Sequence, residues 1–224
     1  IHINDTHPTL AVPELMRILL DECGYTWSKA WHICQNTFAY TNHTVMAEAL
    51  EKWDENLVKR ILPRIYTIIC EINRRYCEGL CARLNDDQRV ARMSIVSRNH
   101  IKMANLCVDA SHSVNGVSKL HSEIIKESVF KDEFDDKPVK FKNVTNGIAY
   151  RRWLLQSNPK LTNLLSECIG DGFKKNGQEL NKFKLFENDA SVLEKLGNIK
   201  RENKLTLAKY LEKSDLVSWV SYPG

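Results

Sequence analysis

The sequence predicts a helix-rich chain with a few short strands, and two observations support this. Apolar residues recur at helical spacing, as Leu15, Ile18 and Leu19 do. Proline and glycine mark where such stripes begin and end, as Pro13 and Gly24 do here. With 224 residues, of which 43% are hydrophobic, the chain is long enough for one large domain or parts of two.

The first half is predicted to consist of helices joined by polar turns. The expected helices are residues 13–23, 54–61 and 63–78, together with one capped by Thr26 or Ser28 that runs toward Gln35. The last two are separated, or joined at a kink, because Pro63 cannot continue a helix already under way. A polar turn around Asn42 follows the second helix, so His43 is expected in a turn between helices.

The second half shows more varied patterns. The expected elements are a surface loop at 83–92, a strand or helix at 103–108, a helix at 113–126, an acidic loop at 132–136, a strand at 139–144, and helices at 159–170 and 192–213. We place a domain boundary between residues 143 and 144, which gives units 1–143 and 144–224. Ile1 opens on a strand-like segment without an initiator methionine, and we interpret this as truncation of a longer chain.

Charge and hydropathy argue against nucleic acid or a membrane as partner. The formal net charge is +4 and is spread along the chain, and no apolar run approaches the ~20 residues that span a bilayer. No signal peptide is recognisable near the start. The seven cysteines are an odd number in mostly apolar surroundings, which predicts free thiols and a cytoplasmic protein. Cys77 and Cys81 lack a second ligand pair, so no metal site is predicted.

Few residues point to chemistry on local sequence alone. Asp5 could orient His7 or join it in binding a metal, although such pairs are common by chance. His43 lies among hydrogen-bonding residues, which suits either a binding loop or an ordinary capping turn. His121 is interpreted as a surface or core histidine, and the arginines before Trp153 as solvated residues beside a packed ring.

Short motifs run in order along the chain, from Ile1 to about Lys213. They are Asn-Asp-Thr-His-Pro at 4–8, Pro-Glu-Leu-Met-Arg-Ile-Leu at 13–19, Tyr-Thr-Asn-His-Thr-Val at 40–45, Glu-Ala-Leu-Glu at 48–51, Ser-His-Ser-Val-Asn-Gly-Val at 111–117, His-Ser-Glu-Ile at 121–124, Thr-Asn-Gly-Ile at 145–148 and Arg-Arg-Trp-Leu at 151–154. Through them the chain resembles the α-glucan phosphorylases that act on glycogen, starch and maltodextrin. Residues 214–224 are expected to depart from that family.

The resemblance implies an α/β fold of the glycosyltransferase-B type, with two Rossmann-like domains across a cleft. Residues 1–143 would close the first domain and residues 144–224 would begin the second, so the chain is expected to be an internal fragment dominated by helix. The implied reaction uses inorganic phosphate to cleave a terminal glucose from an α-1,4-glucan and gives glucose 1-phosphate with retained configuration. The parent enzyme is expected to be a homodimer.

The resemblance also implies roles for six residues. His43 and Asn146 would hold the 6-hydroxyl of the glucosyl unit, and Val117 would line its pocket. Asp5 and His7 would lie at the edge of the same cleft. A separate implied role concerns Trp153, which matches an aromatic residue near the cofactor.

The family's cofactor is pyridoxal 5'-phosphate, and no motif here matches the lysine that carries it. The basic phosphate-binding stretch is also missing, so this chain alone is expected to be inactive. Two hypotheses stay open: a fragment of a pyridoxal-phosphate-dependent phosphorylase, or a non-catalytic carbohydrate-binding or interaction module that kept the sugar cleft.

Overall fold

The computed structural model describes residues 1–213. The chain divides into two compact units, Ile1–Asn146 and Gly147–Gly224, which are described separately below. Helix dominates and the first unit contains a parallel sheet, so the predicted helix-rich α/β class is confirmed. Residues 214–224 lie outside the described residues.

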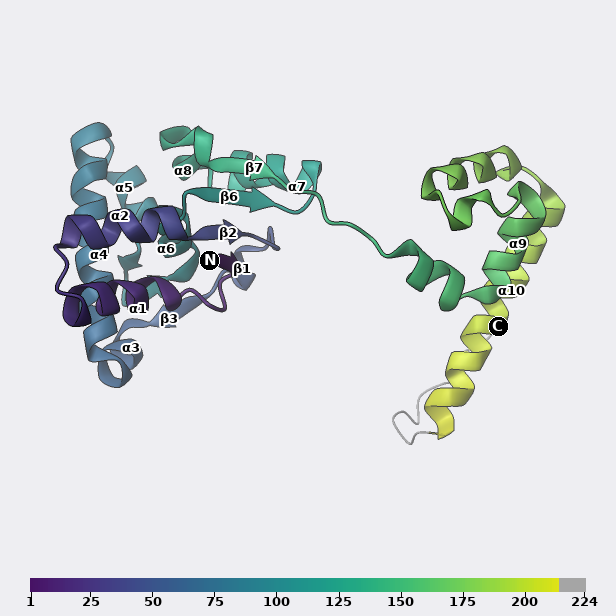
Figure 1. Ribbon diagram of the computed structural model, residues 1–224, viewed down its shortest axis with the longest axis horizontal. Coiled ribbons are helices and arrows are strands. Elements are labelled where there is room, and N and C mark those ends of the chain that lie inside the picture. Colours follow the sequence, from purple (N-terminus) through teal and green to yellow (C-terminus); the bar gives the residue numbers. More distant parts are fainter. Residues whose placement is uncertain (214–224) are drawn as a thin grey trace. The chain divides into compact units, whose positions relative to one another are not determined.

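A four-stranded parallel sheet organises the first unit (Figure 1). Its strands, in spatial order, are β1 His2–Asn4, β2 Ala39–Thr41, β6 Ser113–Gly116 and β7 Phe141–Asn143. The central residue of β1, Ile3, aligns with Tyr40, Val114 and Phe141 across the four strands. All four side chains are buried, so this row runs through the middle of the core.

Eight helices and a small second sheet complete the first unit. The helices are α1 Ala11–Arg17, α2 Trp27–Thr37, α3 Glu55–Ile61, α4 Pro63–Arg83, α5 Asp87–Met93, α6 Met103–Ala110, α7 Lys119–Ile124 and α8 Lys131–Asp136. Single π-helical turns, Ile18–Glu22 and Ile125–Val129, extend α1 and α7. The second sheet is antiparallel, with β3 Lys52–Asp54, β5 His100–Lys102 and β4 Val96–Ser97 in spatial order.

Helix α4 shows why the proline prediction is confirmed. Pro63 is its first residue, where the missing N–H costs nothing, and α3 ends just before it at Ile61. The stripe Ile65, Ile68 and Ile69 is buried in the core, as the periodicity predicts. The helix packs against α1 and α3. The apolar segment 103–108, left open between strand and helix, is helical as part of α6.

Two predicted loops are wrong because they are short helices. In α5, the Asp86 side chain caps the helix by accepting a hydrogen bond from the Arg89 backbone N–H at 2.9 Å. The acidic residues expected in a loop form α8, where Asp132 accepts from the Arg92 guanidinium at 2.6 Å. Arginines of α5 therefore pair with Asp132, one of the acidic residues whose charge had suggested an exposed loop.

The predicted helix at 113–126 is wrong in its first part, which is strand β6. This strand has four residues with alternating burial, too short for periodicity to identify. Strand β2 was missed for the same reason, since it has only three residues. The prediction that His43 lies between helices is therefore also wrong. His43 instead follows the carboxyl end of a strand.

The second unit contains α9 Pro159–Ile169 and α10 Ala190–Lys213, and both predicted helices are confirmed. The Asn158 side chain accepts from the Leu161 N–H at 3.3 Å and thereby caps α9. A π-helical turn, Arg151–Gln156, precedes α9, and the 3₁₀ segments Gly172–Lys174 and Gly177–Phe186 follow it.

Candidate functional site at the carboxyl edge of the parallel sheet

The site predicted from the motifs corresponds to one edge of the four-stranded sheet. Because the strands are parallel, their carboxyl ends meet at that edge, where open α/β sheets commonly bind ligands. Asp5 follows β1, His43 lies just after β2, Val117 follows β6, and Asn146 lies shortly after β7. The fold therefore brings together segments more than a hundred residues apart in sequence.

The turn that carries His43 is held by its neighbours. The buried Asn42 side chain accepts from the Thr44 backbone N–H at 3.0 Å and donates to the Tyr40 hydroxyl at 3.1 Å. His43 itself is exposed, and its Nε2 lies 2.6 Å from Oδ1 of Asn4. With that oxygen as acceptor, Nε2 carries a proton, and in the neutral ring Nδ1 keeps a free lone pair.

Val117 and Asn146 are joined directly through the backbone. The Val144 N–H donates to the Gly116 carbonyl at 3.1 Å, and the Asn146 N–H donates to the Val117 carbonyl at 2.9 Å. These bonds continue the β6–β7 pairing past the strands themselves. Asn146 is exposed, and its carboxamide has no hydrogen-bond partner within residues 1–213.

His121 connects this segment to the His43 turn. Its Nδ1 accepts from the Val117 backbone N–H at 3.1 Å, and its Nε2 lies 3.3 Å from the Thr44 carbonyl oxygen. On local sequence alone, His121 resembles an ordinary surface or core histidine. The His-Ser-Glu-Ile motif contains it, but a motif match alone gives no role to an individual side chain.

Asp5 and His7 lie at the end of the same edge, after β1. Asp5 has φ of +64°, a left-handed conformation that is uncommon outside glycine and that turns the chain sharply away from the strand. Its carboxylate accepts from the Thr6 N–H at 2.7 Å rather than orienting His7. His7 Nδ1 instead pairs with Oε1 of Glu51 at 2.7 Å, and Glu51 also accepts from the Trp53 indole N–H. Glu51 is thus a partner that local sequence did not indicate.

Trp153 belongs to the second unit, in the π-helical turn Arg151–Gln156, and it is 66% exposed. The sequence-based interpretation of a packed tryptophan is therefore wrong within the described residues.

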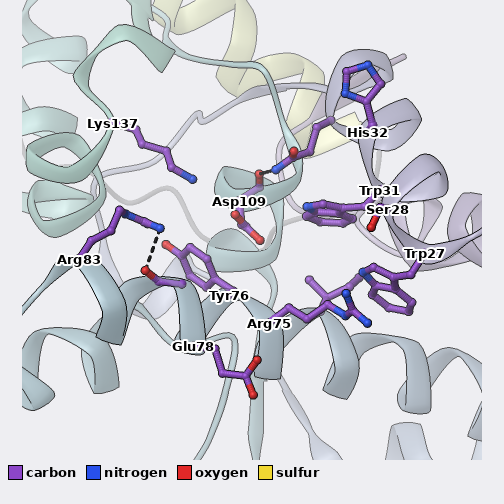
Figure 2. A pocket seen from close by; sticks show the side chains of 13 residues that line it. Trp27, Ser28, Trp31, His32, Arg75, Tyr76, Glu78, Arg83, Asp109 and Lys137 are labelled. Atoms are coloured by element: carbon purple, nitrogen blue, oxygen red, sulfur yellow. Dashed lines mark hydrogen bonds between the residues drawn. The ribbon is translucent and has the colours of Figure 1, made fainter.

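A cavity of about 530 Å³ lies elsewhere in the first unit (Figure 2). Its walls include Trp27, Trp31 and Tyr76, with Asp109 between them. Asp109 lies near the end of α6, a few residues before β6 begins. This cavity is therefore at the amino edge of the sheet, opposite the predicted site. Burial raises the pKa of Asp109, opposed by the nearby Lys140. None of the predicted sugar-binding residues lines this cavity.

Two features are absent from residues 1–213. No group of three or more histidine, cysteine, aspartate or glutamate side chains there could hold a metal ion. No helix in that range has the length and apolar character needed to cross a bilayer.

A family model for carbohydrate phosphorylases matches residues 1–221. The chain belongs to the carbohydrate phosphorylase family. The match extends past Lys213, so the expectation that the family pattern stops there is wrong.

Relatives within this phosphorylase family are similar over most of the chain. Liver-form glycogen phosphorylase from Bos taurus is 49% identical over 217 residues, which cover 95% of this chain and 26% of the relative. Glycogen phosphorylase from Bacillus subtilis is 48% identical over 209 residues, 93% of this chain and 26% of the relative. The human muscle form is 46% identical over 217 residues, with 95% and 26% covered. The chain spans about a quarter of the length of these curated relatives.

Proposed function

We propose that this chain is part of an α-1,4-glucan phosphorylase, which cleaves a terminal glucose with inorganic phosphate to give glucose 1-phosphate. Family membership and the names of the relatives support the reaction class. The observation that carries the proposal is the meeting of the His43 turn with the Val117–Asn146 segment at one sheet edge, joined through His121.

In this proposal the chain holds the glucosyl unit. His43 and Asn146 bind the 6-hydroxyl, since an imidazole nitrogen with a free lone pair and an unpaired carboxamide can together accept from it and donate to it. Val117, which is half-buried, lines the pocket. Asp5 and His7 position substrate at the rim. Oriented groups of this kind hold a sugar while positive charge develops at its anomeric carbon.

We further propose that the parent enzyme uses pyridoxal 5'-phosphate, whose phosphate group supplies acid–base chemistry when bound. We infer that residues 1–213 do not supply its attachment lysine. The lysines with lowered pKa, Lys102 and Lys140, both donate to backbone carbonyls, and burial is the main cause of each shift. Trp153 is the residue proposed to lie near the cofactor in the parent enzyme, whose remaining parts would supply the attachment lysine.

The domain assignment and setting are proposed on the same basis. Residues 1–143 belong to the end of the N-terminal phosphorylase domain, and residues 144–224 to the start of the cofactor-binding domain. The parent is proposed to be a cytoplasmic homodimer that binds glycogen, starch or maltodextrin. All seven cysteines are free, which suits a reducing compartment.

The test is equilibrium binding of glucose to the full chain, followed by NMR. His43→Ala and Asn146→Ala should each weaken glucose binding about tenfold, the effect expected for a lost hydrogen bond of ~1.4 kcal/mol. His32→Ala, an exposed histidine on α2, is the matched control and should leave affinity unchanged. Equal affinity in all four proteins, or no glucose binding at all, would reject the proposed site. Release of glucose 1-phosphate by the chain alone should be undetectable.

A further inference from the structure

His121 lies in the first turn of α7, where the end of β6 turns into the helix. The Ser118 side chain caps this helix by accepting from the His121 backbone N–H at 3.1 Å. The His121 side chain reaches back to the Val117 N–H, one residue before the cap. This reciprocal pattern resembles a capping box, in which the third helical residue bonds backward, but here the bond fixes a residue of the proposed sugar pocket.

The two partners of His121 determine its proton arrangement. A backbone N–H can only donate, so Nδ1 must be unprotonated where it meets Val117. A backbone carbonyl can only accept, so Nε2 must carry the hydrogen that is directed to Thr44. A single neutral imidazole thus joins two separate segments, the one that contains Val117 and the turn that contains Thr44.

The base of α7 is itself held firmly, so His121 has a fixed starting point. The Ser122 hydroxyl donates to the Ser118 carbonyl at 2.8 Å and lies 2.9 Å from Oδ1 of Asn143, at the end of β7. α7 packs against both β6 and β7 (Figure 1). Movement of the His121 ring relative to the sheet edge is therefore restricted, and the ring transmits that restriction to the Thr44 turn.

We propose that His121 is a positioning residue of the glucose site: it holds the turn bearing His43 in register with the segment bearing Val117 and Asn146. This inference rests on the proposed function and goes beyond it, since His121 itself need not touch the sugar. Without the bridge, His43 and Asn146 would no longer converge on one hydroxyl group. The loss should fall on the 6-hydroxymethyl group rather than on the sugar as a whole.

The first experiment measures the affinity of the full chain for glucose and for xylose, which lacks the 6-hydroxymethyl group. Wild type should prefer glucose, and His121→Ala should reduce the glucose-to-xylose preference about fivefold to tenfold. A substitution that only loosened the fold would lower the affinity for both sugars by the same factor. A wild-type preference that His121→Ala leaves unchanged would overturn the role of His121 alone, whereas a wild type that binds neither sugar would overturn the glucose site and with it this role.

Two further variants separate the two bonds of His121. Asn at this position can place its oxygen near the site of Nδ1 but does not reach Thr44, so His121→Asn should keep the Val117 bond and still lose glucose preference. Gln is one carbon longer and can place its amide near the site of Nε2, within reach of the Thr44 carbonyl, so His121→Gln should recover part of the preference. Failure of His121→Gln to exceed His121→Ala in preference would contradict the bridging role.

The second experiment needs no ligand. Nitrogen-15 NMR of the histidine rings should show His121 as the neutral tautomer with hydrogen on Nε2. A ring with hydrogen on Nδ1, or a doubly protonated ring at neutral pH, would overturn the inference whatever the sugar measurements give.

Discussion

The Nε2 atom of His43 lies 2.6 Å from Oδ1 of Asn4, so the ends of β1 and β2 are joined through side chains as well as through the backbone. This contact leaves Nδ1 of His43 as the nitrogen available to a ligand. Asn4 was part of a recognised motif, but nothing in the sequence indicated that it orients a histidine 39 residues away.

Replacing Asn4 by alanine should therefore weaken glucose binding without unfolding the chain. Loss of one neutral hydrogen bond predicts a decrease in affinity of about twofold to tenfold. The measurement is an NMR titration with glucose, and Asn36→Ala on the exposed face of α2 is the matched control. If Asn4→Ala binds glucose as wild type does, the orienting role of Asn4 is wrong.

Gly116 should tolerate no side chain. A Cβ atom there would lie 2.6 Å from the Ser122 hydroxyl oxygen and 2.9 Å from the Ser122 backbone. Gly116→Ala should lower the free energy of unfolding by about 1–3 kcal/mol, measured by urea denaturation. Adding Ser122→Ala should not restore stability, because the backbone atoms remain. Gly79→Ala, which would meet only the Arg83 guanidinium at 3.2 Å and no backbone atom, is the control and should change stability by less than about 1 kcal/mol.

Glu133 should make stability depend on pH. Burial raises its pKa from 4.5 to about 7, reinforced by Asp132 and opposed by Lys102 and Arg89. The folded chain therefore binds this proton more tightly than the unfolded chain, and the resulting stabilisation is complete below about pH 4.5 and lost as pH rises through 7. The variant Glu133→Gln is neutral at every pH, so its stability does not fall in this way as the pH rises.

The expected result is that Glu133→Gln and wild type have similar free energies of unfolding near pH 4, while the variant is more stable near pH 8 by up to ~3 kcal/mol. Denaturant unfolding at the two pH values measures the difference. Glu127→Gln, at an exposed position of the same region, is the control. A Glu133→Gln advantage that does not grow with pH would refute the burial argument.

Asn73 should be important for joining α4 to the segment that follows α5. Its Oδ1 accepts from the backbone N–H groups of Ile95 and Val96 at 2.8 and 3.1 Å, and Ile95 is fully buried. Asn73→Ala leaves both donors unpaired and should cost about 2–4 kcal/mol of unfolding free energy. Asn73→Asp keeps an acceptor and should cost less. Equal losses in the two variants would show that the acceptor oxygen is not what matters.

Long periodic elements were predictable from the sequence, and short ones were not. Helix α4 was identified by its stripe of Ile65, Ile68 and Ile69, because several turns repeat the same signal. Helix α9 was identified by the cap residue Asn158 before Pro159. Strands β2 and β6 contain three or four residues, and their identity depends on pairing with each other. Pairing between distant segments leaves no local pattern, so both were missed.

The candidate site shows the same division. Motifs indicated His43, Val117 and Asn146, whose proposed roles stay predictions. The partners of these residues could not be predicted, because Asn4 and His121 become neighbours of the site only when the carboxyl ends of parallel strands meet. Similarly, the pairing of His7 with Glu51 crosses 44 positions of sequence.

The most direct test of the account is a set of intermolecular nuclear Overhauser measurements on the full chain with carbon-13-labelled glucose. The two protons on carbon 6 should show contacts to the ring of His43 and to the side-chain amide of Asn146 in the same complex. Contacts to only one of these residues, or a glucose bound away from the carboxyl edge of the sheet, would contradict the claim that both residues hold one sugar.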